Sequence, residues 1–206
     1  THQPHVWLRD YGQFAIMPVT KGPVFDEDAR ASWYSHKVEK AKPYYYSAYL
    51  AEYDVVTEMA PTERAVKFRM TYPERDMSYL VIDGFDEGSY VKVIPEENLI
   101  VGYTTKNAGS VTENFCNWFV IESDTPFEYV KGVKDGVFTD AMEVKADHAG
   151  AVVGFRTSKG QQVHFDVASS FISLEQAKFN LNEVKDKSFD AVCQAGRDRW
   201  NDVLGR

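Results

Sequence analysis

Groups of neighbouring carboxylates are the first residues in this sequence whose types could do chemistry. Two carboxyl groups held about 5–9.5 Å apart can cleave a glycosidic bond, one as general acid and the other as nucleophile or general base. The candidates are Glu27-Asp28, Asp83 with Asp86-Glu87, and Glu96-Glu97. Each group lies in a turn-like stretch, where acidic side chains commonly solvate loops and cap backbone groups. We therefore predict that none of them is catalytic.

Histidine and cysteine give as little support for a metal site or a nucleophile. His2 and His5 lie close to Asp10, but without a further paired ligand we interpret this segment as a loop and predict no metal site. His164 alternates with apolar residues, which indicates a sheet histidine with satisfied hydrogen bonds. Cys116 has no matched histidine and is typical of a buried small hydrophobic residue. The sequence also lacks nucleophile-elbow, phosphate-loop and H-E-x-x-H motifs.

Composition limits the class of protein. The chain has 206 residues, and its 44% hydrophobic content is enough for a large core, which excludes a disordered chain. The formal net charge of −8 argues against a nucleic-acid partner, because phosphate binding needs a basic patch. No apolar run approaches the roughly 20 residues of a membrane span, and the first residues do not read as a signal peptide.

The elements that must position any site are predicted to be mainly strands. Residues 44–58 are rich in aromatic and β-branched side chains and are bracketed by Pro43 and Pro61, which indicates one long strand. Residues 66–72 alternate, so one face carries Val66, Phe68, Met70 and Tyr72 and the other carries Lys67, Arg69 and Thr71. A short Pro-Thr-Glu turn joins the two strands.

Further strands recur every 10–14 residues or so without intervening helices. They are predicted at residues 78–85, 89–95, 98–105, 115–123 and 127–133, followed by a hairpin of residues 143–156 and 162–170 with its turn at 158–160. This spacing predicts an all-β fold, a large antiparallel β-sandwich. Trp33 and Trp118 are expected in its core.

The last part of the chain changes to helical periodicity. Ser173 begins a capping box with Gln176, and a second amphipathic helix follows residue 187 with Phe189, Trp200 and Leu204 on one stripe. We therefore divide the chain into a β-sandwich domain, residues 1–172, and a helical linker, residues 173–206. The stripe is expected to be exposed or to be covered by a further domain or a neighbouring molecule.

Aromatic side chains are the better indicators of a ligand, since a Trp or Tyr ring can stack on the apolar face of a sugar. Trp7 lies in a loop rather than in a strand. Two interpretations stay open for it: contact with a ligand or partner domain, and burial in a core of its own.

Several collinear segments resemble one known family. They are Gln3-Pro4, Trp7, Asp10-Tyr11-Gly12-Gln13-Phe14 and Met17-Pro18; Thr57-Glu58, Ala60, Thr62-x-Arg64 and Tyr72-Pro73; and Ser173, Glu175-Gln176-Ala177, Asn180-Leu181, Phe189-Asp190 and Trp200. This order resembles the N-terminal domain of glycoside hydrolase family 92, the exo-acting α-mannosidases. The resemblance weakens between residues 132 and 160, and Arg9 stands where the family is expected to carry a small residue.

The resemblance implies a supersandwich of the galactose-mutarotase type, truncated at its N-terminus, whose linker leads to an (α/α)6 domain. That absent domain would hold the catalytic carboxylates and most ligands of a calcium ion, so this fragment alone would be inactive and hold no cofactor. It would support and rim the active site of an exo-α-1,2-mannosidase acting on mannose-containing glycans. Gln3, Trp7 and Asp10 would bind substrate, and the parent protein would be secreted or periplasmic.

A second function from another class is also open. The sandwich could be a stand-alone carbohydrate-binding or adhesion module with no hydrolase attached. The reading frame beyond Arg206 discriminates between the two: several hundred further residues of helical repeats with paired Asp and Glu favour the mannosidase.

Overall fold

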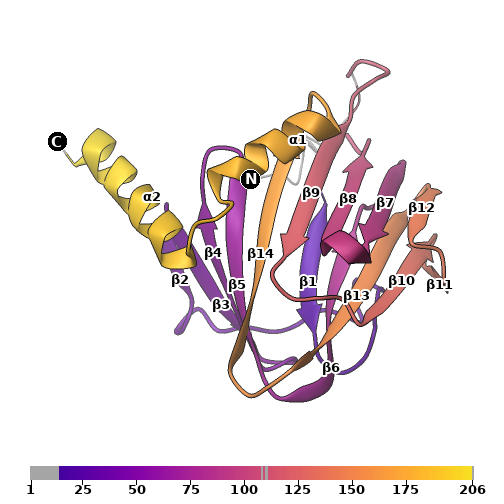
Figure 1. Ribbon diagram of the computed structural model, residues 1–206, viewed down its shortest axis with the longest axis horizontal. Helices are drawn as coiled ribbons and strands as arrows, with labels where there is room; N and C mark the ends of the chain where they lie inside the picture. The colour runs from indigo at the N-terminus through magenta and orange to yellow at the C-terminus, as the bar shows by residue number, and fades with distance from the viewer. Residues whose placement is uncertain (1–13, 108, 110, 206) are drawn as a thin grey trace.

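The computed structural model describes residues 14–107, 109 and 111–205 of the chain. In these residues the strands form two antiparallel sheets, and the α-helices follow at the C-terminal end (Figure 1). The predicted all-β sandwich is therefore confirmed. The two sheets differ in width, because one has nine strands and the other has five.

The large sheet is a continuous antiparallel ladder. In spatial order its strands are β12 (Glu143–Ala146), β7 (Ser89–Ile94), β8 (Leu99–Thr104), β9 (Asn117–Ser123), β14 (Gln161–Ser170), β5 (Ala65–Tyr72), β4 (Val55–Pro61), β3 (Tyr45–Leu50) and β2 (Lys40–Lys42). The short helix η1 (Pro95–Glu97) connects β7 and β8. In β5, Val66, Met70 and Tyr72 are buried in the main core, as the alternation predicts.

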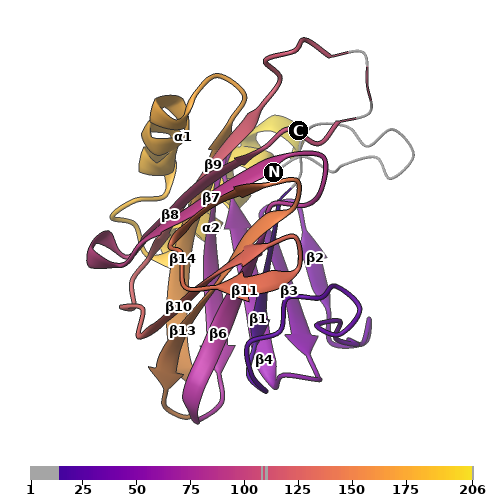
Figure 2. The ribbon, with the colours of Figure 1, turned by 90° about the vertical axis from the view of Figure 1, so that its right-hand side faces the viewer.

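The small sheet covers part of one face of the large sheet (Figure 2). Its strands, in spatial order, are β1 (Ala15–Val19), β6 (Arg75–Asp83), β13 (Ala149–Thr157), β10 (Tyr129–Lys134) and β11 (Val137–Thr139). Strand β1 is at one edge of this sheet, where its register pairs Met17 with Val81 of β6.

Two of the points where the chain passes from one sheet to the other, after β5 and after β13, lie at the lower end of the view in Figure 1. The predicted hairpin of residues 143–156 and 162–170 is therefore wrong: β12 and β13 belong to different sheets, and β14 pairs with β5 and β9. The two crossings are bonded together, since the Thr157 hydroxyl donates to the Pro73 carbonyl oxygen over 2.8 Å and the Gly160 amide donates to the Tyr72 oxygen over 2.9 Å.

A single strand over residues 44–58 was also a wrong prediction. The segment is the hairpin β3–β4, and its turn spans residues 51–54. Asp54 reverses the chain with a φ of 55°, a left-handed conformation that Asp adopts more easily than most residues. The proline brackets mark the outer ends of this hairpin rather than the ends of one strand.

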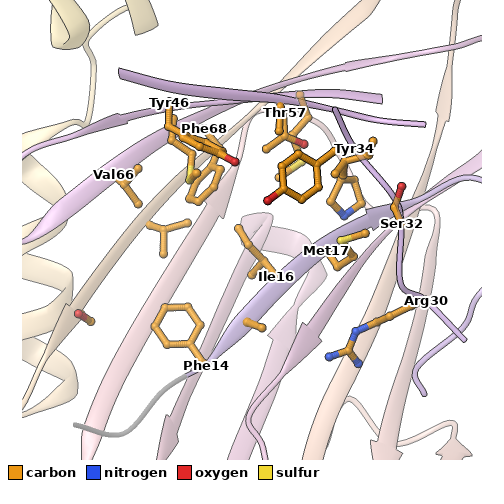
Figure 3. A pocket seen from close by; sticks show the side chains of 18 of the residues that line it. Phe14, Ile16, Met17, Arg30, Ser32, Tyr34, Tyr46, Thr57, Val66 and Phe68 are labelled. Carbon is orange, nitrogen blue, oxygen red and sulfur yellow. The ribbon is translucent and has the colours of Figure 1, made fainter. Parts of the chain in front are cut away.

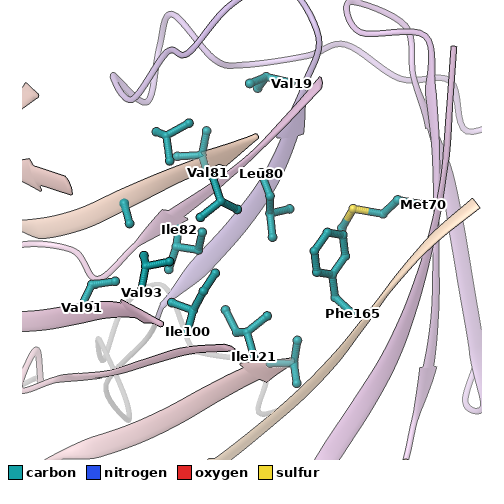
Figure 4. Packing of buried hydrophobic residues seen from close by; sticks show 14 of the residues in the cluster. Val19, Met70, Leu80, Val81, Ile82, Val91, Val93, Ile100, Ile121 and Phe165 are labelled. Carbon is teal, nitrogen blue, oxygen red and sulfur yellow. The ribbon is translucent and has the colours of Figure 1, made fainter. Parts of the chain in front are cut away.

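The main core lies between the two sheets. Leu80 and Ile82 of β6 face Met70, Phe165 and Ile121 of the large sheet (Figure 4), and each of these five side chains is almost completely buried. Close packing of these side chains holds the two sheets together. Burial of each large apolar side chain contributes about 1.5–3 kcal/mol to the stability of the folded chain.

Two helices cover the outer face of the large sheet. Helix α1 (Leu174–Asn180) packs on β14 and β9, and α2 (Phe189–Leu204) packs on β4 and β5 (Figure 1). The predicted N-cap is confirmed, since the Ser173 hydroxyl accepts a hydrogen bond from the Gln176 amide over 3.1 Å. The helices bury a second apolar cluster that includes Ala177, Leu181, Val184, Phe189 and Val192.

The expected stripe on α2 is divided by this packing. Phe189 is buried, whereas Trp200 and Leu204 are 44% and 68% exposed on the part of the helix that extends beyond the sheet (Figure 1). Trp118 is half-buried against the second cluster. The core position predicted for Trp33 is wrong, because that side chain is 69% exposed on a loop. No helix of the described residues is long and apolar enough to span a membrane.

Candidate functional site

A large cavity lies between the sheets. It has a volume of 730 Å³ and is found where the edge strand β1 faces the wider part of the large sheet, β3 to β5 (Figure 3). Its lining includes Phe14, Ile16, Met17, Tyr34, Tyr46, Thr57, Val66 and Phe68. We call this cavity the inter-sheet cleft. Its volume is within the range of about 300–1,000 Å³ that is typical of small-molecule sites.

The lining is mainly apolar, with a few polar groups from the surrounding strands and loop. The Tyr46 hydroxyl donates to Glu39 over 2.6 Å, and a His36 ring nitrogen lies 2.6 Å from the other oxygen of that carboxylate. Burial, with the hydrogen bond to Glu39, raises the pKa of Tyr46 to about 12. The hydrogen bond from Tyr46, followed by that with His36, lowers the pKa of Glu39. The Tyr46 hydroxyl therefore stays protonated and Glu39 stays ionised at neutral pH.

Thr57 is the unusual polar group of the inter-sheet cleft. Its hydroxyl oxygen is inaccessible to solvent and has no hydrogen-bond partner in the described part of the chain. An unpaired buried hydroxyl costs about 1–3 kcal/mol. The side chain is on β4 and lines the cavity (Figure 3).

A buried ionic network lies beside the inter-sheet cleft. Arg30, which lines the cleft, is paired with Asp83 over 2.5 Å and also donates to the Phe25 carbonyl oxygen. The second oxygen of Asp83 is 2.7 Å from a His148 ring nitrogen and accepts from the Phe85 amide over 2.8 Å. Both Asp83 oxygens are thus already bonded, so this carboxylate ties the 25–30 loop to the end of β6.

The other carboxylates considered as catalytic pairs have different surroundings. Glu27 and Asp28 are exposed on a turn, and Glu96 and Glu97 are exposed on η1. The exposed Asp86 is paired with Lys106, and the hydrogen bond from that lysine lowers its pKa. These exposed carboxylates lack the buried, apolar surroundings that keep a glycosidase general acid protonated.

Partly buried carboxylates on the outer face of the large sheet are held in ion pairs. The largest influence on Glu58 is burial, which raises its pKa, but hydrogen bonds from Arg69 and Tyr45 and the charge of Arg69 outweigh it, so the pKa is lowered. Asp166 is the exception, since burial raises its pKa more than the 2.6 Å pair with Lys67 lowers it. Lys67 also contacts the Val184 carbonyl oxygen, which places this pair under the helical segment as a structural support.

His164 and Cys116 have structural rather than catalytic surroundings, as predicted, although Cys116 is half-buried rather than fully buried. His164 is a satisfied sheet histidine, with a ring nitrogen 2.7 Å from Asp124. Burial raises the pKa of Cys116 to about 11, and burial also raises the pKa of Cys193. Neither thiol is ionised at neutral pH, so neither is prepared as a nucleophile.

The three substrate-binding residues predicted from sequence, Gln3, Trp7 and Asp10, lie outside the described residues, as do His2 and His5. Their roles stay predictions. Among the described residues, no group of three or more His, Cys, Asp or Glu side chains is placed to hold a metal ion.

Sequence reasoning missed the partners of Asp83. The carboxylate was interpreted with Asp86 and Glu87 as part of an acidic turn. One signal pointed the other way, since Asp83 directly follows the apolar run from Leu80 to Ile82 and so ends a buried strand. A buried carboxylate requires a partner, but nothing in the sequence identifies Arg30.

A comparison with models of known families matches residues 1–170 to the glycosyl hydrolase family 92 N-terminal domain. The chain belongs to glycosyl hydrolase family 92. No curated protein matches it. Solved structures of the same family agree with this assignment over the strands and the helices alike.

A family 92 inverting mannosidase from Bacteroides thetaiotaomicron superposes on 100% of the chain with a TM-score of 0.93 and 35% identity. A family 92 α-mannosidase from the same organism, solved with mannoimidazole, superposes on 95% of the chain with a TM-score of 0.84 and 26% identity. A third family 92 hydrolase, ccman5, shares the fold with a TM-score of 0.80 at 23% identity. The chain spans 28% of the length of each of these three proteins.

Proposed function

We propose that this chain is the non-catalytic N-terminal domain of an exo-acting α-mannosidase. The observation that carries the proposal is the superposition of the whole chain, helices included, on an inverting mannosidase with a TM-score of 0.93 at 35% identity. That enzyme has more than three times the length of this chain, which covers 28% of it. The substrate class we propose is mannose-containing glycans, with α-1,2 linkages as the finer proposal.

The carboxylates support placing the chemistry elsewhere in the polypeptide. Glycoside hydrolysis needs one protonated and one ionised carboxyl group on opposite sides of the bond that is cleaved. In the described residues, the candidate pairs are exposed on turns or, in the case of Asp83, fully bonded to Arg30 and His148. We therefore propose that an (α/α)6 domain following α2 supplies the acid and the base.

The sandwich would support and rim that active site. We propose that Gln3, Trp7 and Asp10 contribute an amide, a stacking face and a carboxylate toward sugar hydroxyls. Calcium is proposed as the cofactor of the complete enzyme, bound mainly by residues outside this chain. We also propose export of the enzyme to the periplasm or the medium, where extracellular glycans are available.

Two polypeptides test the proposal. The purified chain should fold and hydrolyse no p-nitrophenyl α-mannoside, with or without calcium, whereas a polypeptide extended through the following domain should hydrolyse it in a calcium-dependent manner. Turnover by the chain alone that survives repurification and is lost in Asp83→Asn would place catalysis in the sandwich. A stop codon shortly after Arg206 would contradict the two-domain enzyme and favour a stand-alone carbohydrate-binding module.

A further inference from the structure

A second, smaller hollow lies at the end of the sandwich where β1 leads into the following loop. It has a volume of 270 Å³ and lies between residues 21–31 and the turn that joins β3 to β4. Its walls include Lys21, Gly22, Pro23, Ala31, Glu52 and Tyr53. We call it, together with the neighbouring Trp33, the Trp33 hollow. Only Ala31 also lines the inter-sheet cleft.

Hydrogen bonds fix the two sides of the Trp33 hollow relative to each other. The Thr20 hydroxyl donates to the Tyr53 carbonyl oxygen over 2.8 Å. The Glu52 amide donates to the Ser32 hydroxyl over 3.1 Å, and the Ala51 amide donates to the Trp33 carbonyl oxygen over 3.1 Å. A site whose walls are already fixed loses little entropy when it binds a ligand.

Trp33 is the most exposed aromatic side chain of this region, at 69%. Its carbonyl oxygen accepts from the Ala51 amide, next to Glu52, so the Trp33 backbone lies against the turn that borders the hollow. Tyr34, the next residue, is 45% exposed but lines the inter-sheet cleft instead. A large aromatic face held on a fixed loop can stack on the C–H face of a sugar ring.

Trp200, the other exposed tryptophan of the described residues, has different surroundings. On α2 it lies one turn before Val203 and Leu204, which are 57% and 68% exposed, so its neighbours form an apolar surface suited to another protein domain. Around Trp33 the neighbours are the hydroxyl of Ser32 and the charged pair Lys21–Glu52. This mixture of one aromatic face and several hydrogen-bonding groups is suited to a hydroxyl-rich ligand.

The charged pair supplies both kinds of hydrogen-bonding group. Lys21 donates to Glu52, and their side chains are 62% and 41% exposed. Because an exposed ion pair contributes little to stability, its members can turn toward a ligand at small cost. The ammonium group can donate to one sugar hydroxyl oxygen, and the carboxylate beside it can accept a hydrogen bond from the adjacent hydroxyl group. The pair is neutral as a whole, so it favours an uncharged sugar.

We propose that the Trp33 hollow is a glycan-binding site, separate from the active-site rim, that takes one neutral hexose unit of a polymeric glycan. The mannose-containing identity of that glycan rests on the proposed function. The site would hold a long glycan on the sandwich, and this would raise the local concentration of the glycan near the active site.

Native electrophoresis of the purified chain in gels containing yeast α-mannan tests the proposal. Mannan should retard the parent chain, Trp33→Ala should abolish the retardation, and Trp33→Phe should keep most of it because a stacking face remains. Trp200→Ala is the matched control and should be retarded like the parent. Because Trp33 is exposed, its replacement should leave the urea midpoint unchanged. No retardation of the parent, or equal retardation of Trp33→Ala and the parent, would overturn the proposal.

A second measurement separates this proposal from the proposed enzyme. In a polypeptide that also carries the following domain, Trp33→Ala should lower the rate on dilute mannan at least fivefold and leave hydrolysis of p-nitrophenyl α-mannoside unchanged. Absence of hydrolysis would contradict the enzyme while mannan retardation still supported the site. Protection of Trp33 from N-bromosuccinimide by the second domain, without glycan, would show that the hollow is a domain interface and would overturn the site.

Discussion

The guanidinium group of Arg69 lies over the ring of Phe189, with 4.2 Å between the guanidinium carbon and the ring centroid. The same group makes a two-pronged ion pair with Glu58, over 2.7 and 2.9 Å, and a third contact with Asp190 over 3.1 Å. Arg69 is on β5 and Phe189 is the first residue of α2. This contact therefore fixes the start of the helix that we propose leads to the catalytic domain.

Replacing Arg69 with Met should lower the free energy of unfolding by about 2–3 kcal/mol, because Glu58 is left half-buried without its partner and the contact with Phe189 is lost. Urea unfolding followed by circular dichroism measures this change. Arg64→Met is the control: Arg64 pairs with Glu183 from a side chain that is 59% exposed, and its loss should cost at most about 1 kcal/mol. Equal losses in the two variants would show that Arg69 does not fasten α2.

Stability should fall in acid because several carboxylates have lowered pKa values in the folded chain. For Glu58 and Glu183, burial raises the pKa, but hydrogen bonds outweigh it and the net shift is downward. A carboxylate with a lowered folded-state pKa contributes stability that is complete above its ordinary value of 4.5 and is lost as the pH falls through the lowered value. The urea midpoint should therefore be constant above this ordinary value and decrease as the pH falls below it.

Glu58→Gln should reduce this pH dependence, since the amide does not titrate. Glu96→Gln, at an exposed position of η1, should leave it as it is in the parent. A decrease of the urea midpoint in acid that is the same in the parent and in Glu58→Gln would show that Glu58 makes no contribution to it.

Local patterns predicted the strands and the starts of the helices. The alternation in β5 gives its buried and outer faces correctly, and the Ser173 cap is visible in the sequence because its hydroxyl bonds only three residues along the chain. Which sheet a strand joins is decided by pairing between distant residues, so the turn at residues 158–160 was mistaken for a hairpin. The inter-sheet cleft depends on the unequal widths of the sheets, which no local pattern reports.

The candidate site was less predictable than the fold. Trp33 was assigned to the core, but its side chain is exposed. The hydrogen bond from the Ala51 amide to the Trp33 carbonyl oxygen holds this loop against the β3–β4 turn. Asp83 was interpreted from its sequence neighbours, whereas its partners Arg30 and His148 are 53 and 65 residues away. Sites of this kind are formed by tertiary contacts.

Thr57→Val should raise the free energy of unfolding by about 1 kcal/mol, because it keeps the side-chain shape and removes a buried hydroxyl that has no partner among the residues that the structure describes. The matched control is the same replacement at Thr157, whose hydroxyl bonds to Ser78 and to the Pro73 carbonyl oxygen, each over 2.8 Å. Thr157→Val should lower stability by about 1–3 kcal/mol. A loss of stability in Thr57→Val would indicate that its hydroxyl is bonded in solution, for example to a ligand in the inter-sheet cleft.

Trp7→Ala, made in a polypeptide that carries both domains, should lower kcat/KM for an α-mannoside at least about tenfold, which corresponds to about 1.4 kcal/mol of lost transition-state binding. The reason is that we propose the indole as a stacking face of the active-site rim. Steady-state kinetics and urea unfolding together separate this role from packing, because truncation of a core tryptophan costs about 3–5 kcal/mol of stability. Trp118→Ala is the control for a packing role, since Trp118 is half-buried against the second apolar cluster. If Trp7→Ala loses stability as Trp118→Ala does and keeps the parent kcat/KM, Trp7 is a core residue and the substrate-binding assignment of Gln3, Trp7 and Asp10 fails.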